Sequence, residues 1–183
     1  KIKSLMSVKE GELNNDYELP SISFIVAAYN EEGVIISKIK NTQLMDYPKE
    51  KVQFIIMTDG SDDNTYEVAS SCEGVEVYHD PRRQGKIAAV NRALKFVKNE
   101  ILIFSDANAM LNKEAFKEIV KHYSSSEVGC VAGEKRIHIP GESDASSAGE
   151  GFYWKYESLL KKMDYQLNTS VGAAGELFSI RKE

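Results

Sequence analysis

Asp106 and Asn108 are the first candidates for chemistry, because they place two oxygen ligands two positions apart after the apolar run Ile101–Phe104. On an extended chain, residues two apart point to the same side, so both oxygens would face one point. Mg²⁺ and Mn²⁺ prefer oxygen ligands and keep open positions for phosphate oxygens. The pair therefore predicts a divalent cation that stabilises a departing nucleotide diphosphate. The alternative role for Asp106, a helix cap, is better filled by Asn112.

Two further polar segments could bind a nucleotide. The carboxylate of Asp59, in the segment Asp59–Thr65, could accept the N–H of a nucleobase. The basic segment Arg82–Lys86 could bind a diphosphate through charge-assisted hydrogen bonds, and Gly85 would let the backbone approach a ligand closely. Each segment has a plainer interpretation, an Asp-Gly turn in the first case and a solvated basic turn in the second. The residue types alone leave both interpretations open.

The small residues of Gly172–Gly175 form another candidate site, because they could make the floor of a sugar or acceptor pocket. They could equally form an ordinary turn into a strand, and spacing alone does not decide between the two.

The segments between these motifs alternate between short apolar runs and helical spacing of apolar residues. Strands are expected at residues 22–27, 52–57, 75–79, 101–104 and 128–132, with amphipathic helices between them. Oxygens of Ser61, Asp62 and Asp63 are expected to cap the second helix. This order indicates an α/β domain with a mostly parallel central sheet and helices on both faces. Right-handed crossovers bring the polar strand ends to one edge, where open α/β sheets bind ligands.

The composition sets limits on the function. The chain has 183 residues, 42% of them hydrophobic, which suits a single buried core. A net charge of −5 argues against nucleic-acid binding but permits a nucleotide held through a cation. Cys72 and Cys130 lie in apolar stretches and are expected to be reduced core residues, which indicates a reducing compartment. The sequence contains neither a membrane span nor a secretory signal, and its start at Lys1 suggests a piece of a longer chain.

Taken in order, these motifs resemble those of the family 2 glycosyltransferases, inverting enzymes with the nucleotide-binding α/β fold called GT-A. The matching segments are Ile25–Glu32, Asp59–Thr65, Gly85-Lys86 with Ala89–Ala93, and Ser105–Asn108. The match implies a polar lead-in over residues 1–19 and a GT-A-type nucleotide-sugar-binding domain over residues 20–183. Its length, with a helix expected at Glu150–Asp164, is similar to that of membrane-associated polysaccharide synthases of the hyaluronan, chitin and cellulose type. The more general bacterial transferases of the family are the alternative.

The resemblance also implies roles for individual residues. Nucleotide-binding roles fall on Ala27, Tyr29 and Glu31 around the nucleoside, Asp59 at the base, Lys86 at the nucleotide and Asp106 at the diphosphate. Asn108 occupies the second position of the family's DxD metal motif, where an amide in place of a carboxylate implies weaker metal affinity. Gly175, Glu176 and Arg181 are similar to the segment beneath the acceptor sugar.

The function implied by the resemblance is sugar transfer with inversion from a nucleoside-diphosphate sugar, a UDP-sugar, to a saccharide or lipid-linked acceptor. Mg²⁺ or Mn²⁺ would assist the leaving diphosphate. The family's catalytic base lies beyond the Gly-Ala-Ala-Gly segment, so we expect it beyond Glu183. We expect residues 1–183 to bind the donor with little or no sugar transfer. The resemblance further implies a cytoplasmic domain, at the cytoplasmic face of a membrane in the full-length protein.

Three alternatives to this function remain. A sugar-nucleotide nucleotidyltransferase would carry a glycine-rich loop after the first strand, where this chain has Ala27–Glu32. A non-catalytic nucleotide-binding module would explain the missing base. A phosphoacceptor domain built on Asp59 would need an acidic pair after the first strand, which Asn30-Glu31-Glu32 matches only loosely.

Overall fold

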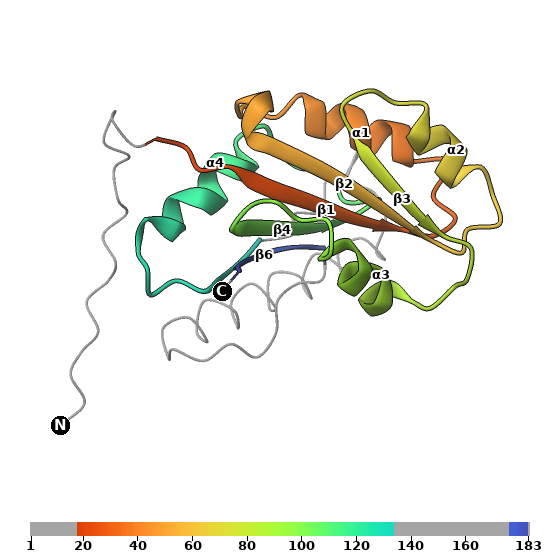
Figure 1. Ribbon diagram of the computed structural model, residues 1–183. Coiled ribbons are helices and arrows are strands. Elements are labelled where there is room, and N and C mark those ends of the chain that lie inside the picture. Colours follow the sequence, from red (N-terminus) through yellow and green to blue (C-terminus); the bar gives the residue numbers. More distant parts are fainter. Residues whose placement is uncertain (1–17, 134–175, 183) are drawn as a thin grey trace, which may run out of the picture.

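The computed structural model describes residues 18–133 and 176–182, and it shows one six-stranded sheet in the order β3-β2-β1-β4-β6-β5 (Figure 1). The first four strands run parallel, whereas β6 is antiparallel to both of its neighbours, β4 and β5. The strands are β1 (Ile22–Ala28), β2 (Val52–Asp59), β3 (Glu76–Asp80), β4 (Ile101–Asp106), β5 (Cys130–Ala132) and β6 (Leu177–Arg181). The prediction of a mostly parallel α/β sheet is confirmed.

The helices cover both faces of this sheet, as predicted (Figure 1). Three of them pack on one face, and α3 packs on the other. The helices are α1 (Ile35–Gln43), α2 (Thr65–Ser70), α3 (Lys86–Ala93) and α4 (Ala115–Val120), with short 3₁₀ turns η1 (Lys49–Lys51) and η2 (Lys121–Ser124).

Alternating strand residues divide the core between the two faces. Phe24 packs with Phe116 of α4 on one face, while Ile25 packs with Ala89 and Ala93 of α3 on the other. Because β1 is covered on both sides, its residues are nearly all buried, and the sequence reads as a continuous apolar run. Each buried large apolar side chain contributes about 1.5–3 kcal/mol, so these two layers fix the positions of the strand ends.

The strand predicted at residues 128–132 is present as the shorter β5, Cys130–Ala132. β5 points in the same direction as β4 but is separated from it by β6, so it lies at the edge of the sheet. Only Val131 of this strand packs against the core, and Cys130 is exposed. The prediction that Cys130 is a core residue is therefore wrong, whereas Cys72 is partly buried against the core, and both thiols are free.

Two expected features lie outside the described residues, namely the helix at 150–164 and the small-residue segment Gly172–Gly175. Within residues 18–133 and 176–182, no helix has the length and apolar character needed to cross a lipid bilayer.

Candidate functional site

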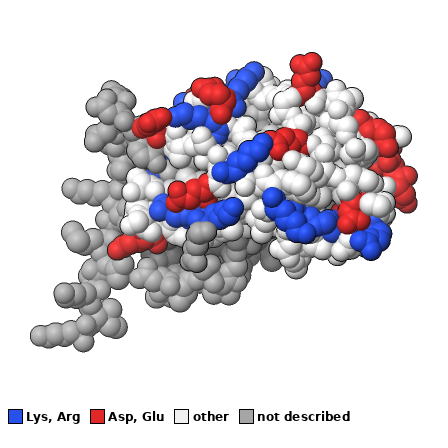
Figure 2. All heavy atoms as spheres, in the orientation of Figure 1, with Lys and Arg blue, Asp and Glu red and all other residues white. Residues whose placement is uncertain are grey.

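The carboxyl ends of β1 to β4 bring most of the predicted nucleotide-binding residues to one edge of the sheet. The register pairs Ala27 of β1 with Asp106 of β4, and Asp59 of β2 with Asp80 of β3. Acidic side chains line the end of the molecule toward which β1 and β2 point, with basic side chains close to them (Figure 2). This edge therefore combines both signs of charge on loops that follow neighbouring strands.

Asp106 and Lys86 form an ion pair across this edge, joining the end of β4 to the first residue of α3. Both side chains are partly exposed, with relative accessibilities of 30% for Asp106 and 51% for Lys86. Glu31 lies near this ion pair. Burial raises the pKa of Glu31, and the negative charges of Asp106 and Asp63 raise it further. Carboxylates can bind a cation, and a lysine beside them can bind a diphosphate, so both ligands could occupy this edge together.

Asn108 reaches this edge differently from the prediction. β4 ends at Asp106, and the N–H of Ala109 donates to the Asp106 carbonyl at 3.3 Å, so Asp106–Ala109 is a turn. The argument from an extended chain is therefore wrong for Asp106 and Asn108. Both residues stay on one short turn, in which Asp106 is partly exposed and Asn108 is exposed. The described residues contain no group of three or more His, Cys, Asp or Glu arranged around a metal position. A cation at Asp106 would therefore take most of its ligands from outside these residues, as from the oxygens of a diphosphate.

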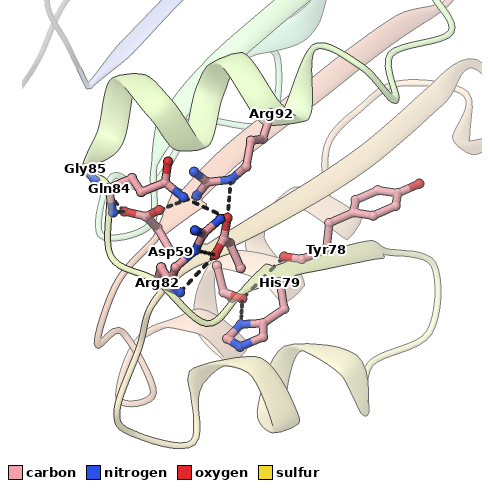
Figure 3. A network of polar contacts seen from close by, with 9 residues as sticks. Asp59, Tyr78, His79, Arg82, Gln84, Gly85 and Arg92 are labelled. Carbon is pink, nitrogen blue, oxygen red and sulfur yellow. Dashed lines mark hydrogen bonds and ion pairs between the residues drawn. The ribbon is translucent and has the colours of Figure 1, made fainter.

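Asp59 lies at the centre of a polar network that ties the end of β2 to the basic loop Arg82–Lys86, which follows β3 (Figure 3). Its Oδ2 accepts the backbone N–H groups of Gln84, at 3.0 Å, and Gly85, at 2.6 Å. Its Oδ1 accepts a hydrogen bond from Nη2 of Arg92 on α3. Burial alone would raise the pKa of Asp59, but these three donors and the Arg92 charge hold it below its usual range. Asp59 is therefore ionised, and it fixes the loop that leads to Lys86.

Asp80 adds a second carboxylate to this network. Its side chain accepts the Arg82 N–H at 2.9 Å and the Gln84 amide at 2.9 Å, and it lies 3.6 Å from Nε of Arg92. Asp59 and Asp80 thus hold the predicted basic turn in place. Arg92, which was not predicted as a site residue, contacts both carboxylates.

Gly60 allows a close backbone approach between the loop after β2 and the basic loop after β3. Gly60 has φ +67°, and a Cβ there would lie 2.3 Å from the Arg83 nitrogen. Gly85 also has a positive φ, +91°, but a Cβ there would meet no atom within 4 Å. Gly85 therefore has a backbone conformation that favours glycine at the start of α3, and its close approach to a ligand stays a prediction. Gly60 allows the two loops to touch.

Tyr29 and Glu31 belong to a loop held by the segment after β2. The Glu31 N–H donates to the Thr65 hydroxyl at 2.8 Å, and the Arg83 guanidinium lies over the Tyr29 ring at 3.9 Å.

Of the three oxygens predicted to cap α2, only that of Asp63 bonds to its first turn, accepting the Thr65 N–H at 3.0 Å. Ser61 and Asp62 form hydrogen bonds with Asn30 instead.

The predicted acceptor residues separate in the structure. The Glu176 carbonyl accepts the Asp106 N–H at 3.2 Å, so Glu176 reaches the edge of interest. Arg181 pairs with Ile101 at the opposite end of β4, and its guanidinium donates to the Tyr123 carbonyl at 2.7 Å. Gly175 lies outside the described residues. The structure thus brings Glu176, but not Arg181, to Asp106.

A pocket of about 220 Å³ opens beside Lys86, between α3 and the sheet. Its lining includes Ala27, Asn91, Ser105 and Phe178. A larger pocket of about 580 Å³, lined by Ile36, Met45 and Cys72 among others, lies near the start of β2, away from the charged strand ends. The smaller pocket is the one that adjoins the candidate site.

Comparison with known proteins gives the family. The model of the family described as glycosyl transferase family 2 matches residues 23–183. The chain belongs to glycosyl transferase family 2. It is 30% identical over 168 residues to a beta-monoglucosyldiacylglycerol synthase from a Nostoc species, covering 87% of this chain and 34% of the relative. It is 28% identical over 182 residues to a poly-beta-1,6-N-acetyl-D-glucosamine synthase from Staphylococcus aureus, covering 96% of this chain and 42% of the relative.

This family 2 chain therefore spans about a third to two fifths of these relatives. Solved structures with the same fold include a mannosyltransferase from Pyrobaculum calidifontis in complex with GDP-Man and Mn²⁺, with a TM-score of 0.74 and 24% identity, covering 90% of this chain and 45% of the other. A glucosyl-3-phosphoglycerate synthase from Mycobacterium tuberculosis, in complex with Mn²⁺, UDP-Glc and phosphoglyceric acid, has a TM-score of 0.62 and 22% identity, covering 88% and 57%. These similarities show that the fold is that of GT-A glycosyltransferases, as predicted.

Proposed function

We propose that residues 20–183 form a nucleotide-sugar-binding domain that takes a nucleoside-diphosphate sugar, a UDP-sugar, at the carboxyl edge of the sheet. The observation that carries this proposal is the Lys86–Asp106 ion pair, which places a partly exposed cation and carboxylate together at the end of β4. Ala27, Tyr29, Glu31 and Asp59 lie on the neighbouring strand ends, where a nucleoside would extend from the diphosphate.

A divalent cation, Mg²⁺ or Mn²⁺, would be held by Asp106 and Asn108 together with diphosphate oxygens. The donor set supports this, because hard cations take carboxylate and amide oxygens and share them with phosphate. The pKa of Glu31 is raised first by burial and then by the charges of Asp106 and Asp63, so the carboxylates at this edge lie close enough to affect one another. When bound, the cation would neutralise charge on the leaving diphosphate. Two similar structures are described as complexes with Mn²⁺ and a nucleotide sugar.

For the full-length protein, we propose sugar transfer with inversion to a saccharide or lipid-linked acceptor at the cytoplasmic face of a membrane. The names of the two relatives support these acceptor classes, since one is a glucosyldiacylglycerol synthase and the other a polysaccharide synthase. Within this chain, Lys86 would bind the diphosphate directly, and Asp59 would hold the Gln84–Gly85 backbone that sets the position of Lys86. Glu176, whose carbonyl bonds to Asp106, would lie at the acceptor side.

Calorimetric titration of the chain with UDP, with and without Mn²⁺, tests the donor site. We expect binding that strengthens with Mn²⁺ and weakens in Asp106→Ala. Asp46→Ala is the matched control, because Asp46 is an aspartate exposed at the surface and paired with Lys117 away from the strand ends. Undetectable UDP binding, or binding that depends neither on Mn²⁺ nor on Asp106, would contradict the proposal.

Parallel titrations separate this function from its alternatives. Binding of GDP in preference to UDP would indicate that the donor is a guanosine-diphosphate sugar. Formation of UDP-sugar from UTP and sugar 1-phosphate would indicate a nucleotidyltransferase. For the transfer step, the full-length protein is assayed for UDP release from several UDP-sugars. Tight UDP binding without release in the presence of saccharide and lipid acceptors would favour a non-catalytic module.

A further inference from the structure

Lys38 is a fully buried lysine beside the candidate diphosphate site. It lies on the inner face of α1, between Ile35 and Ile39, and its relative exposure is 0%. Its ammonium lies 5.2 Å from the centroid of the Phe24 ring, inside the larger core layer. A buried ammonium is costly unless its donors find acceptors, so the partners of Lys38 indicate what this position does.

The acceptors of Lys38 flank the turn that carries Asp106 and Asn108. Nζ donates to the Ser105 hydroxyl at 2.8 Å and also to the Ala109 carbonyl. Ser105 is the residue before Asp106, and Ala109 is the residue after Asn108. One side chain therefore connects both ends of the Asp106–Asn108 segment to a helix in the core.

Lys38 and Lys86 approach Asp106 from opposite faces of the sheet, because α1 and α3 pack on opposite faces. Lys86 forms the partly exposed ion pair with Asp106, whereas Lys38 reaches the neighbouring residues from inside. Burial lowers the pKa of Lys38 to about 8, and the Asp106 charge opposes that shift, so the two groups sense each other electrostatically.

We propose that Lys38 is a positioning residue for the donor site, holding the Ser105–Ala109 turn so that Asp106 and Asn108 present their oxygens to the cation and diphosphate. The inference rests on the proposed donor-binding function of Asp106. Lys38 does not touch the nucleotide; it acts by fixing the turn between two anchor points.

Asn41, one turn further along α1, provides an internal control. Its amide donates to the Leu111 carbonyl at 2.9 Å and its oxygen accepts the Leu111 N–H at 2.9 Å. Asn41 therefore anchors the same connection, but beyond the turn that carries Asp106 and Asn108. Loss of Asn41 likewise removes two hydrogen bonds, here between neutral groups, without releasing Ser105 or Ala109.

The test compares Lys38→Met, Lys38→Arg and Asn41→Ala by UDP titration in the presence of Mn²⁺ and by thermal unfolding. Methionine keeps the apolar length of the side chain and removes the donor, so both hydrogen bonds to the turn are lost. We expect a folded protein with about tenfold weaker UDP binding. Lys38→Arg keeps charge and donors and is expected to bind UDP more tightly than Lys38→Met. Asn41→Ala is expected to lower stability while leaving UDP affinity within about twofold.

A double variant separates positioning from general loss of structure. If Lys38 acts through the Asp106 turn, Lys38→Met in the Asp106→Ala background should cost little further affinity. If the wild type binds UDP and Lys38→Met binds it equally well, the inference fails and the proposed function stands. The same holds if Lys38→Met lowers UDP affinity by the same factor in the wild-type and the Asp106→Ala backgrounds. Failure of the wild type to bind UDP would overturn both.

Discussion

Asp59 at the end of β2 and Arg92 on α3 form an ion pair that is almost closed to solvent, with side-chain exposures of 4% and 19%. The pair joins the strand end to the helix that begins with Lys86, and the backbone of Gln84 and Gly85 completes it. The position of the basic loop thus depends on a buried charge pair.

Replacing Asp59 with asparagine should test this dependence, because it keeps the shape of the side chain and removes the charge. We expect a loss of about 2–4 kcal/mol in the free energy of unfolding, since Arg92 loses its closest carboxylate in a buried setting. Urea unfolding provides the measurement. Asp46→Asn makes the same chemical change in an exposed pair and should cost less than about 1 kcal/mol. Equal effects of the two variants would contradict the assignment.

The pH dependence of the same pair has a definite sign. The folded pKa of Asp59 lies below its usual value, so its contribution to stability is present above the unfolded pKa of about 3.9 and is lost as pH falls through the folded pKa. We therefore expect the stability difference between wild type and Asp59→Asn to be constant near neutral pH and to shrink below about pH 4. Unfolding in urea at a series of acidic pH values measures it. A difference that grows on acidification would contradict the ion pair.

The sequence allowed the sheet and the location of the site to be predicted, but not the residues that hold the site in place. Apolar runs identified β1 to β5 but not β6, and parallel strands necessarily carry Ala27, Asp59 and Asp106 to one edge. A lysine in a helix is normally expected to face solvent. Lys38 can be buried because Ser105 and Ala109 accept its hydrogen bonds, and these residues lie 67 and 71 positions further along the chain. Such distant partners leave no local signal.

Local geometry was a second limit to prediction from the sequence. A spacing of two residues indicates a common side only while the chain stays extended, and the chain turns directly after Asp106. The edge position of β5 likewise depends on β6, whose residues lie far along the chain. An Asp-Gly dipeptide at residues 59–60 was visible as a turn signal, yet the contact between Gly60 and Arg83 required the fold.

Three glycine-to-alanine variants should separate backbone strain from steric overlap. Gly60→Ala meets both a positive φ and the Arg83 backbone, Gly85→Ala meets only a positive φ, and Gly33→Ala meets neither. We expect stability losses in that order, with about 1–2 kcal/mol for strain alone and a larger loss at Gly60. Thermal unfolding of the three proteins checks the order. A Gly60 variant as stable as the Gly33 variant would mean that the two loops do not touch.

Lys86→Ala should change the affinities for metal and nucleotide in opposite directions. The substitution removes the cation that pairs with Asp106, so we expect Mn²⁺ alone to bind several-fold more tightly. UDP should bind about tenfold more weakly, because a charged donor to the diphosphate is lost. Calorimetry with each ligand separately measures both. Lys98→Ala, which removes an exposed lysine paired with Glu76, should change neither affinity. Parallel changes in both affinities would show that Lys86 does not compete with the cation at Asp106.

The buried ammonium of Lys38 should impose an alkaline pH dependence on stability. Its folded pKa of about 8 lies below the unfolded value of 10.5, so the unfolded chain binds more protons between these values. The free energy of unfolding of the wild type, minus that of Lys38→Met, should therefore rise by about 2 kcal/mol between about pH 7 and about pH 9.5. Taking the difference between the two proteins cancels the titration of other groups. Urea unfolding of both across this range measures it, and a flat difference would mean that the ammonium is solvated rather than buried against Ser105 and Ala109.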